Sequence, residues 1–385
     1  MSRRPSLLSL LPLLLGGALL PPAATAQVTP RTYIAFGDSI TFGTGDQANL
    51  GGYPGRLQTL LIARGVNAQV VNAGLPGETT VDGLTRINTV LNRGGDVLLL
   101  MEGTNDINEH VSLETTIFDL NQMATRAEAR GMQAVHATIP PRLSSANYDG
   151  TNHFTESLAV QIRELAFRHD RRLADPFEVF FHLTPNFESL YVGGSDKLHP
   201  NAAGYDLMAR VFADVLTNVD SVPPVVGGIF PLDGATDVPA STSIDVDLYD
   251  FGAGIDLSAT QLLINGQAVV TPLNGTPRKV TISYQSPQPL AGGVTVSLHS
   301  RDTATPPNTL DRQLTQFVIA GTTFLAGDLD RNGRVDGADL LLFAPHFGAR
   351  TGDPRYRAVC DLNNDGIVDG QDLALLATNF GRSSF

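Results

Sequence analysis

Tyr33-Ile34-Ala35-Phe36-Gly37-Asp38-Ser39-Ile40-Thr41 joins a short apolar run to small polar residues. Such a run fits a buried strand, and the polar residues are typical of a turn into a helix. Further apolar runs occur at 70–71, 97–101 and 134–139. Longer segments of helical periodicity lie near 54–64, 81–93, 113–130, 155–169 and 201–217. Strands alternating with helices predict an α/β fold, in which a parallel sheet is covered by helices on both faces.

Glycine-containing polar motifs directly follow three of these predicted strands. Ser39 follows the first, Gly74 and Gly77 follow the second, and Gly103 and Asn105 follow the third. In an open parallel sheet, ligands bind beyond the carboxyl ends of the strands. We therefore expect these residues, although distant in sequence, to meet at one edge of the sheet.

A fourth motif, Asp196-Lys197-Leu198-His199-Pro200, supplies a base for the Ser39 hydroxyl. A serine needs such a base within hydrogen-bond reach to act as a nucleophile near neutral pH. Of the eight histidines, only His199 has an aspartate three residues before it, and Asp196 would fix the tautomer of its ring. Attack on an ester creates an oxyanion. The backbone N–H groups of Ser39 and Gly77 and the side-chain amide of Asn105 would bind it.

These four motifs, in this order, resemble those of the SGNH (GDSL-type) hydrolases over nearly all of residues 31–217. The resemblance implies a flavodoxin-like three-layer α/β/α fold and a two-step acyl-enzyme mechanism without a metal in the active site. Ser39 would be the nucleophile, and Asp196 would orient the base His199. Gly77 and Asn105 would be the oxyanion donors beside the nucleophile. No Gly-x-Ser-x-Gly elbow occurs, which separates the chain from the α/β-hydrolases.

The C-terminal segment contains an acidic repeat whose second copy follows the first after 33 residues. Each copy places side-chain oxygens at loop positions 1, 3, 5, 9 and 12 and glycine at position 6, and position 7 offers its carbonyl, as Ca²⁺ requires. The repeat resembles a dockerin module, which implies two structural calcium sites in a small α-helical module and no cofactor for catalysis. The implied ligands are Asp328, Asp330, Asn332, Arg334, Asp336 and Asp339 in the first loop, and Asp361, Asn363, Asp365, Ile367, Asp369 and Asp372 in the second.

Dockerins recognise cohesins partly through loop positions 10 and 11. Here these positions are Gly337-Ala338 and Gly370-Gln371 rather than the Ser/Thr pairs of cellulosome members. A cohesin-like partner, a cell-surface partner and docking within the chain therefore all stay open.

Between 223 and 323 the pattern changes to period two, as at Ile244, Val246 and Leu248, which predicts a β-sandwich. Asn265-Gly266 predicts a type I′ hairpin. The stretch 231–239 resembles the opening of bacterial immunoglobulin-like (Ig-like) repeats, so we interpret this region as a spacer. Its Asp250 and Asp256 are interpreted as turn residues, with ion ligation as the alternative.

At the N-terminus, Arg3 and Arg4 precede an apolar run from 7 to 20 and the small residues Ala24-Thr25-Ala26. This pattern is typical of a signal peptide over 1–26, so we expect a secreted protein, extracellular or periplasmic, without a transmembrane segment in the mature chain. A formal net charge of −13 excludes nucleic acid as a partner. The single cysteine, Cys360, is interpreted as a packed apolar residue.

The expected organisation is a signal peptide (1–26), an SGNH hydrolase domain (31–217), an Ig-like sandwich (223–323) and a dockerin-like module (326–385). Export, a spacer and a dockerin-like tail are typical of polysaccharide-degrading enzymes, and the short polar loops 41–52 and 107–115 offer no apolar lid. We therefore predict a carboxylic-ester hydrolase that removes acetyl or short acyl groups from carbohydrate. The alternatives are a lysophospholipase or broad-specificity acyl esterase, and, in another class, a non-catalytic surface adhesion or assembly protein.

Overall fold

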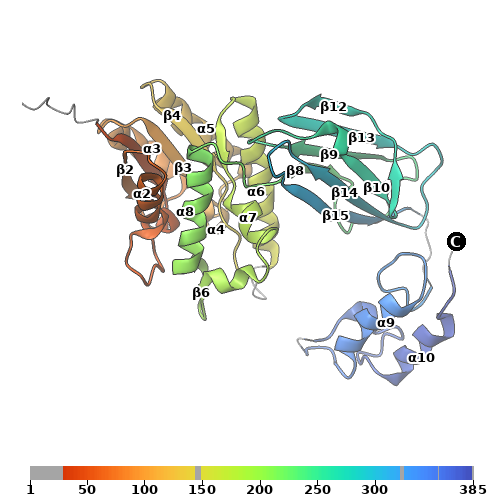
Figure 1. Cartoon of the computed structure of the whole chain (residues 1–385). Coiled ribbons are helices and arrows are strands. Elements are labelled where there is room, and N and C mark those ends of the chain that lie inside the picture. The colour runs from red at the N-terminus through yellow and green to blue at the C-terminus, as the bar shows by residue number, and fades with distance from the viewer. Residues whose placement is uncertain (1–28, 144–148, 321–324, 354, 384–385) are drawn as a thin grey trace, which may run out of the picture.

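The computed structural model describes residues 29–143, 149–320, 325–353 and 355–383. The predicted signal peptide lies outside the described residues. Along the chain, an α/β unit is followed by two antiparallel sheets and then by a small unit around two helices (Figure 1). None of the helices in the described ranges combines the length and the apolar character that crossing a bilayer requires.

The α/β unit is built on a five-stranded parallel sheet in the flavodoxin-like order β2-β1-β3-β4-β5. Its central strand β3 is apolar at every position and buried throughout, as a strand covered on both faces must be. The strands are β1 (Arg31–Gly37), β2 (Ala68–Gly74), β3 (Val97–Met101), β4 (Gln133–Ala137) and β5 (Arg172–Ala174).

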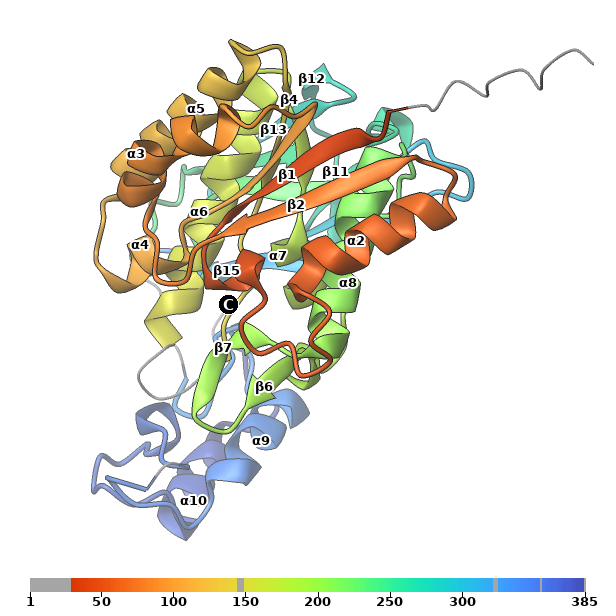
Figure 2. The ribbon, with the colours of Figure 1, turned by 90° about the vertical axis from the view of Figure 1, so that its left-hand side faces the viewer.

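Helices cover both faces of this sheet, so the predicted three-layer α/β/α fold is confirmed. α2 and α8 pack together on one face, and α3, α5 and α6 lie on the other (Figure 2). Thr79 and Asp82 form a capping box at the start of α3, which fixes where the loop after β2 ends. The helices are α1 (Ser39–Phe42), α2 (Gly52–Ala63), α3 (Thr80–Leu91), α4 (Thr104–Asn108), α5 (Leu113–Glu128), α6 (Asp149–Arg168), α7 (Pro176–Phe181) and α8 (Ala202–Leu216).

The next unit is a β-sandwich of two four-stranded sheets, in the orders β11-β10-β14-β15 and β12-β13-β9-β8. Ile244, Val246 and Leu248 of β9 are buried in a core shared by both sheets, as the period-two pattern predicted. Asn265 and Gly266 have φ values of 50° and 74°, which agrees with the predicted type I′ turn. The strands are β8 (Val225–Phe230), β9 (Ser243–Tyr249), β10 (Gln261–Ile264), β11 (Gln267–Val269), β12 (Leu273–Thr276), β13 (Lys279–Gln285), β14 (Gly293–Arg301) and β15 (Thr309–Val318).

The C-terminal unit has two helices, α9 (Gly337–Phe343) and α10 (Gly370–Asn379), each directly after an acidic loop. Both helices begin with a capping box, formed by Asp336 and Asp339 in α9 and by the corresponding aspartates in α10. A small core of Val335, Phe343, Cys360, Val368 and Leu376 joins the two repeats. Cys360 is buried in this core, which agrees with the packing role predicted for it.

Candidate active site

Ser39 lies where β1 turns into the short helix α1. Asp38 is the N-cap of α1, and its Oδ1 accepts a hydrogen bond of 2.8 Å from the Ile40 N–H. Only glycine fits at position 37, because an added Cβ would overlap the carbonyl oxygen of Met101 and the side chain of Thr41. The tight turn holds the Ser39 side chain at the carboxyl end of β1, where the residue is 7% exposed.

His199 connects Ser39 to Asp196 through its two ring nitrogens. His199 Nε2 lies 2.9 Å from Ser39 Oγ, and Nδ1 lies 3.0 Å from Asp196 Oδ2. The other oxygen, Oδ1, accepts hydrogen bonds from the backbone N–H groups of Leu198 (3.0 Å) and His199 (2.9 Å). Asp196 and His199 both lie on β7 (Asp196–Pro200), which pairs with β6 (Tyr191–Gly193) in a hairpin. The structure therefore brings these three predicted residues into one hydrogen-bonded chain.

The charge of Asp196 is stabilised by its neighbours. Burial raises its pKa, but the hydrogen bonds from the backbone of His199 and Leu198 and from the His199 ring outweigh burial, and the pKa lies below the ordinary value. An ionised Asp196 accepts a hydrogen bond from the Nδ1–H of His199. Nε2 is then left as the acceptor for the Ser39 hydroxyl.

The predicted oxyanion donors come from the loops after β1, β2 and β3. Asn105 lies in the first turn of α4, and its Nδ2 donates a 2.7 Å hydrogen bond to the carbonyl of Glu78, next to Gly77. This bond fixes the orientation of the amide, and the second N–H of Nδ2 has no acceptor among the described residues. Within the described ranges, the backbone N–H groups of Ser39 and Gly77 donate no hydrogen bond, so both are available to a ligand.

Asp106 anchors the loop that carries Asn105. Its buried carboxylate accepts hydrogen bonds from the Thr80 N–H (2.9 Å) and the Thr116 hydroxyl (3.0 Å), and it also contacts the Thr80 hydroxyl. These contacts tie α4 to the starts of α3 and α5. Asp106 thus holds the short helix α4, which carries Asn105, in place.

Two buried carboxyl groups, Asp38 and Glu102, directly follow β1 and β3. Burial raises the pKa of Asp38 to about 6, although its hydrogen bond from Ile40 opposes the change. Burial also raises the pKa of Glu102 well above its ordinary value, and the nearby charges of Asp38 and Glu78 act in the same direction.

A cleft of about 320 Å³ borders Asp196 and His199. Asn108 and Arg142 form part of its wall, and the guanidinium of Arg142 donates to Asn108 Oδ1 (2.6 Å) and to the Thr104 carbonyl (2.5 Å). Arg142 is buried, so it fixes the shape of the cleft. The sequence prediction missed it, because a single arginine in a polar segment carries no periodic or motif signal.

The two C-terminal loops offer oxygen ligands suited to Ca²⁺. Ligand oxygens of Asp328, Asp330 and Asp339 lie within 4.8 Å of one another, and the buried Asp328 Oδ1 has no hydrogen-bond partner among the described residues. Gly333 N–H donates to Asp328 Oδ2 (2.9 Å), and Gly366 N–H donates to Asp361 Oδ2 (2.8 Å) in the same way. This shared geometry and the unpartnered oxygen fit a hard cation.

Two protein-family models match the chain. Residues 35–207 match the GDSL-like Lipase/Acylhydrolase family, and residues 326–380 match the dockerin type I domain. Esterase TesA from Pseudomonas aeruginosa is 32% identical over 152 residues, which are 39% of this chain and 75% of that protein.

Solved structures that are similar to about half of this chain include the following two. A lipase/acylhydrolase from Enterococcus faecalis is 26% identical, with a TM-score of 0.43, over 48% of this chain and 93% of that one. A catalytic mutant of an acetylxylan esterase from Geobacillus stearothermophilus is 22% identical, with a TM-score of 0.42, over 48% of this chain and 94% of that one.

Proposed function

The chain belongs to the GDSL-like lipase/acylhydrolase family and carries a dockerin type I domain, and we propose that it is a serine esterase whose nucleophile is Ser39. The observation that carries this proposal is the hydrogen-bonded chain from Ser39 Oγ through the His199 ring to Asp196. Such a chain activates a hydroxyl that is otherwise a weak nucleophile.

In the first step, His199 Nε2 takes the Ser39 proton as Oγ attacks the carbonyl carbon of the ester. The carbonyl oxygen becomes an oxyanion, which the N–H groups of Ser39 and Gly77 and the free N–H of Asn105 stabilise. The intermediate collapses, and the alcohol leaves with the proton from His199. A water molecule then gives its proton to His199 and attacks the acyl-enzyme, which releases the acid and regenerates Ser39.

The proposed substrate is an acetyl or short acyl ester of a carbohydrate. The cleft beside His199 has polar walls in Asn108 and Arg142, which suits a hydrophilic alcohol better than a lipid. Dockerin domains bind cohesins, and dockerin modules occur in extracellular cellulosome components. An esterase attached to such a component would lie close to acylated polysaccharide, which would be its substrate.

A second candidate, a lysophospholipase or broad-specificity acyl esterase, is favoured by one observation. A second pocket, of about 390 Å³, is formed by α4, α6 and the start of α5, and its apolar lining residues are Ile107, Val111, Leu113, Phe154 and Leu158. Phe154 is also largely exposed. This apolar wall would suit a longer acyl chain.

The proposal assigns a role to each segment of the chain. Residues 1–26 would direct secretion, residues 31–217 would form the hydrolase, and the sandwich of 223–323 would be an Ig-like spacer. The module of 326–385 would hold two Ca²⁺ ions and attach the enzyme to a cohesin-like or cell-surface partner. Calcium would have a structural role only, because the proposed catalytic residues need no metal.

Release assays distinguish the substrate classes. The purified chain is incubated with acetylated xylan, acetylated pectin and lysophospholipid, and the released acid is quantified. We expect acetate from at least one polysaccharide at a rate well above that of fatty acid from lysophospholipid. Faster fatty-acid release would favour the second candidate. Failure of a serine-directed phosphonate to label the chain would favour a non-catalytic adhesion or assembly protein.

A further inference from the structure

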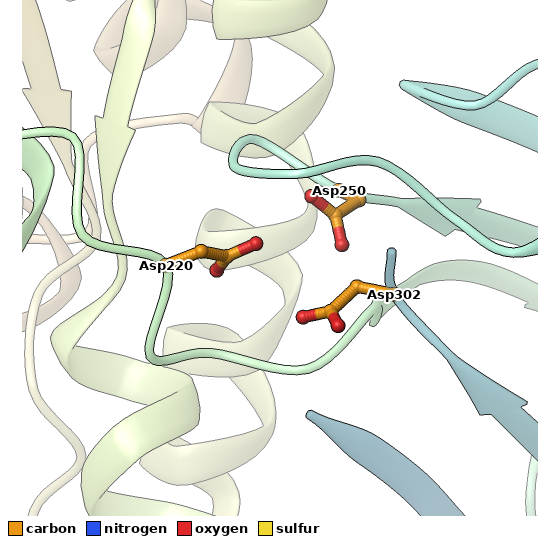
Figure 3. Close-up of side chains that lie close together, drawn as sticks. All are labelled: Asp220, Asp250 and Asp302. Carbon is orange, nitrogen blue, oxygen red and sulfur yellow. The ribbon is translucent and has the colours of Figure 1, made fainter. Parts of the chain in front are cut away.

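Three aspartates meet where the α/β unit joins the sandwich (Figure 3). Asp220 lies in the linker after α8, Asp250 follows β9, and Asp302 follows β14. One carboxylate oxygen from each residue lies within 4.8 Å of the other two. The cluster is separate from the loops of the C-terminal module, and it brings the linker after α8 together with two loops of the sandwich.

The Asp250 carboxylate points toward the other two with one oxygen unpartnered. Oδ1 accepts hydrogen bonds from the N–H groups of Gly252 (2.8 Å) and Gly254 (2.9 Å). Oδ2 is buried and has no hydrogen-bond partner among the described residues, and Asp250 as a whole is only 4% exposed. Figure 3 shows this carboxylate directed toward Asp220 and Asp302. A buried carboxylate oxygen left unpaired is costly unless a ligand satisfies it.

The side chains of Asp302 and Asp220 are held in place by neighbouring donors. Asp302, 1% exposed, accepts from the Asn308 N–H (2.8 Å) and the Asn308 side-chain amide (2.6 Å). Asp220 Oδ2 accepts from the Ala253 N–H (2.6 Å). Among the described residues, no lysine, arginine or histidine forms an ion pair with any of the three aspartates. The negative charge of the cluster is therefore not balanced by the protein.

The surrounding space suits an ion and its water. Gly252 leaves room for the Asp220 carboxylate, because an added Cβ at position 252 would overlap it. A cavity of about 270 Å³ opens beside the cluster and is lined by Asp220, Asp250 and the linker residues.

We propose that Asp220, Asp250 and Asp302 bind one Ca²⁺ ion, which fastens the sandwich to the α/β unit. Calcium takes six to eight oxygen ligands in flexible geometry, and carboxylates from three separate segments with water in the adjoining cavity match that preference. Elsewhere the same junction is held by ion pairs, such as Arg312 with Glu178 (2.9 Å) and Lys279 with Glu164 (3.0 Å). At the aspartate cluster, the cation would take the role that those ion pairs have elsewhere in the junction.

The test counts Ca²⁺ bound to the full-length chain by native mass spectrometry. The parent chain carries Asp328→Asn and Asp361→Asn, which weaken the C-terminal loops, so that the junction is measured against a low background. Asp250→Asn and Asp302→Asn are each added to this parent. Asparagine at 250 keeps an oxygen for the Gly252 and Gly254 N–H groups, so the turn is retained. Asp311→Asn is the matched control, because Asp311 is an exposed aspartate of the same sandwich, with a side chain 78% exposed.

We expect Asp250→Asn and Asp302→Asn each to bind one Ca²⁺ fewer than the parent, while the Asp311→Asn control binds the same number. Equal calcium counts in the parent and in either cluster variant would overturn the proposal. Gly252→Ala gives an independent check without a change of charge, since the added methyl group occupies the place of the Asp220 carboxylate. It should also lose one ion, and retention of the ion would contradict the proposed position. Turnover of p-nitrophenyl acetate by each variant verifies that the α/β unit is folded.

Discussion

Replacing Asp196 by asparagine tests whether His199 depends on this carboxylate for its tautomer. Asp196 Oδ1 accepts two backbone hydrogen bonds, of 3.0 and 2.9 Å, and Oδ2 faces His199 Nδ1 at 3.0 Å. An asparagine must keep its oxygen toward the two backbone N–H groups, so its NH₂ group would face Nδ1. Nδ1 then has to accept a hydrogen bond, and the ring proton moves to Nε2. Nε2 can no longer accept the proton of Ser39.

The size of the expected loss in kcat follows from this change of the His199 tautomer. The corresponding exchange in a serine-protease triad lowers kcat about 10⁴-fold, which corresponds to about 5 kcal/mol of transition-state stabilisation. We expect a loss of about 10³- to 10⁴-fold in kcat for p-nitrophenyl acetate, with KM nearly unchanged. The control is Asp206→Asn, which makes the same charge change at an exposed residue of α8 and should stay within a few-fold of the wild type. A folded Asp196→Asn variant whose kcat fell by less than tenfold would refute the role of Asp196 in setting the His199 tautomer.

Three further predictions concern the oxyanion donors, a buried carboxyl group and the calcium loops. Asn105→Ala should lower kcat for p-nitrophenyl acetate by about 10²- to 10³-fold, and a change of tenfold or less would remove Asn105 from that role. The pKa of Asp38 is raised to about 6 in the folded protein, from the ordinary value of 3.8, so the folded state binds this proton more tightly than the unfolded state. Asp38 therefore stabilises the fold at low pH, and this stabilisation is lost as the pH rises through 6. As the pH rises from 4 to 7, the free energy of unfolding of Asp38→Asn, measured in urea, should therefore increase relative to that of the wild type, by at most about 3 kcal/mol. A difference in unfolding free energy that stays constant across this pH range would contradict the raised pKa of Asp38. Calcium chelation should make the C-terminal module sensitive to protease while esterase turnover stays within twofold. Parallel loss of turnover would show that the two units are not independent.

Much of the α/β unit could be predicted because its signals are local. Each long strand is an apolar run followed by a turn motif, and the carboxyl ends of parallel strands share one edge of the sheet. The sequence therefore indicated that Ser39 and Asn105 approach each other. Asp196 and His199 could be paired because they are only three residues apart, but the short strand β7 on which they lie was not predicted.

The features that escaped prediction depend on burial or on distant partners. β5 and the β6–β7 hairpin are too short to show a periodic pattern. The burial of Arg142 cannot be read from a polar segment. Asp250 was interpreted first as a turn residue, and the hydrogen bonds that its carboxylate accepts from the N–H groups of Gly252 and Gly254 agree with that interpretation. Its position beside Asp220 and Asp302 results from how the two units pack, which no local pattern encodes.

The most direct test of the account is to locate the serine that reacts with an active-site-directed phosphonate. The wild-type chain and a His199→Ala variant are treated with the reagent, and the labelled peptide is identified by mass spectrometry. We expect one phosphonyl group per wild-type chain, on Ser39, and little or no labelling of His199→Ala over the same time. Labelling of another serine with loss of esterase activity, or equal labelling of Ser39 in His199→Ala, would contradict the proposed activation of Ser39 by His199.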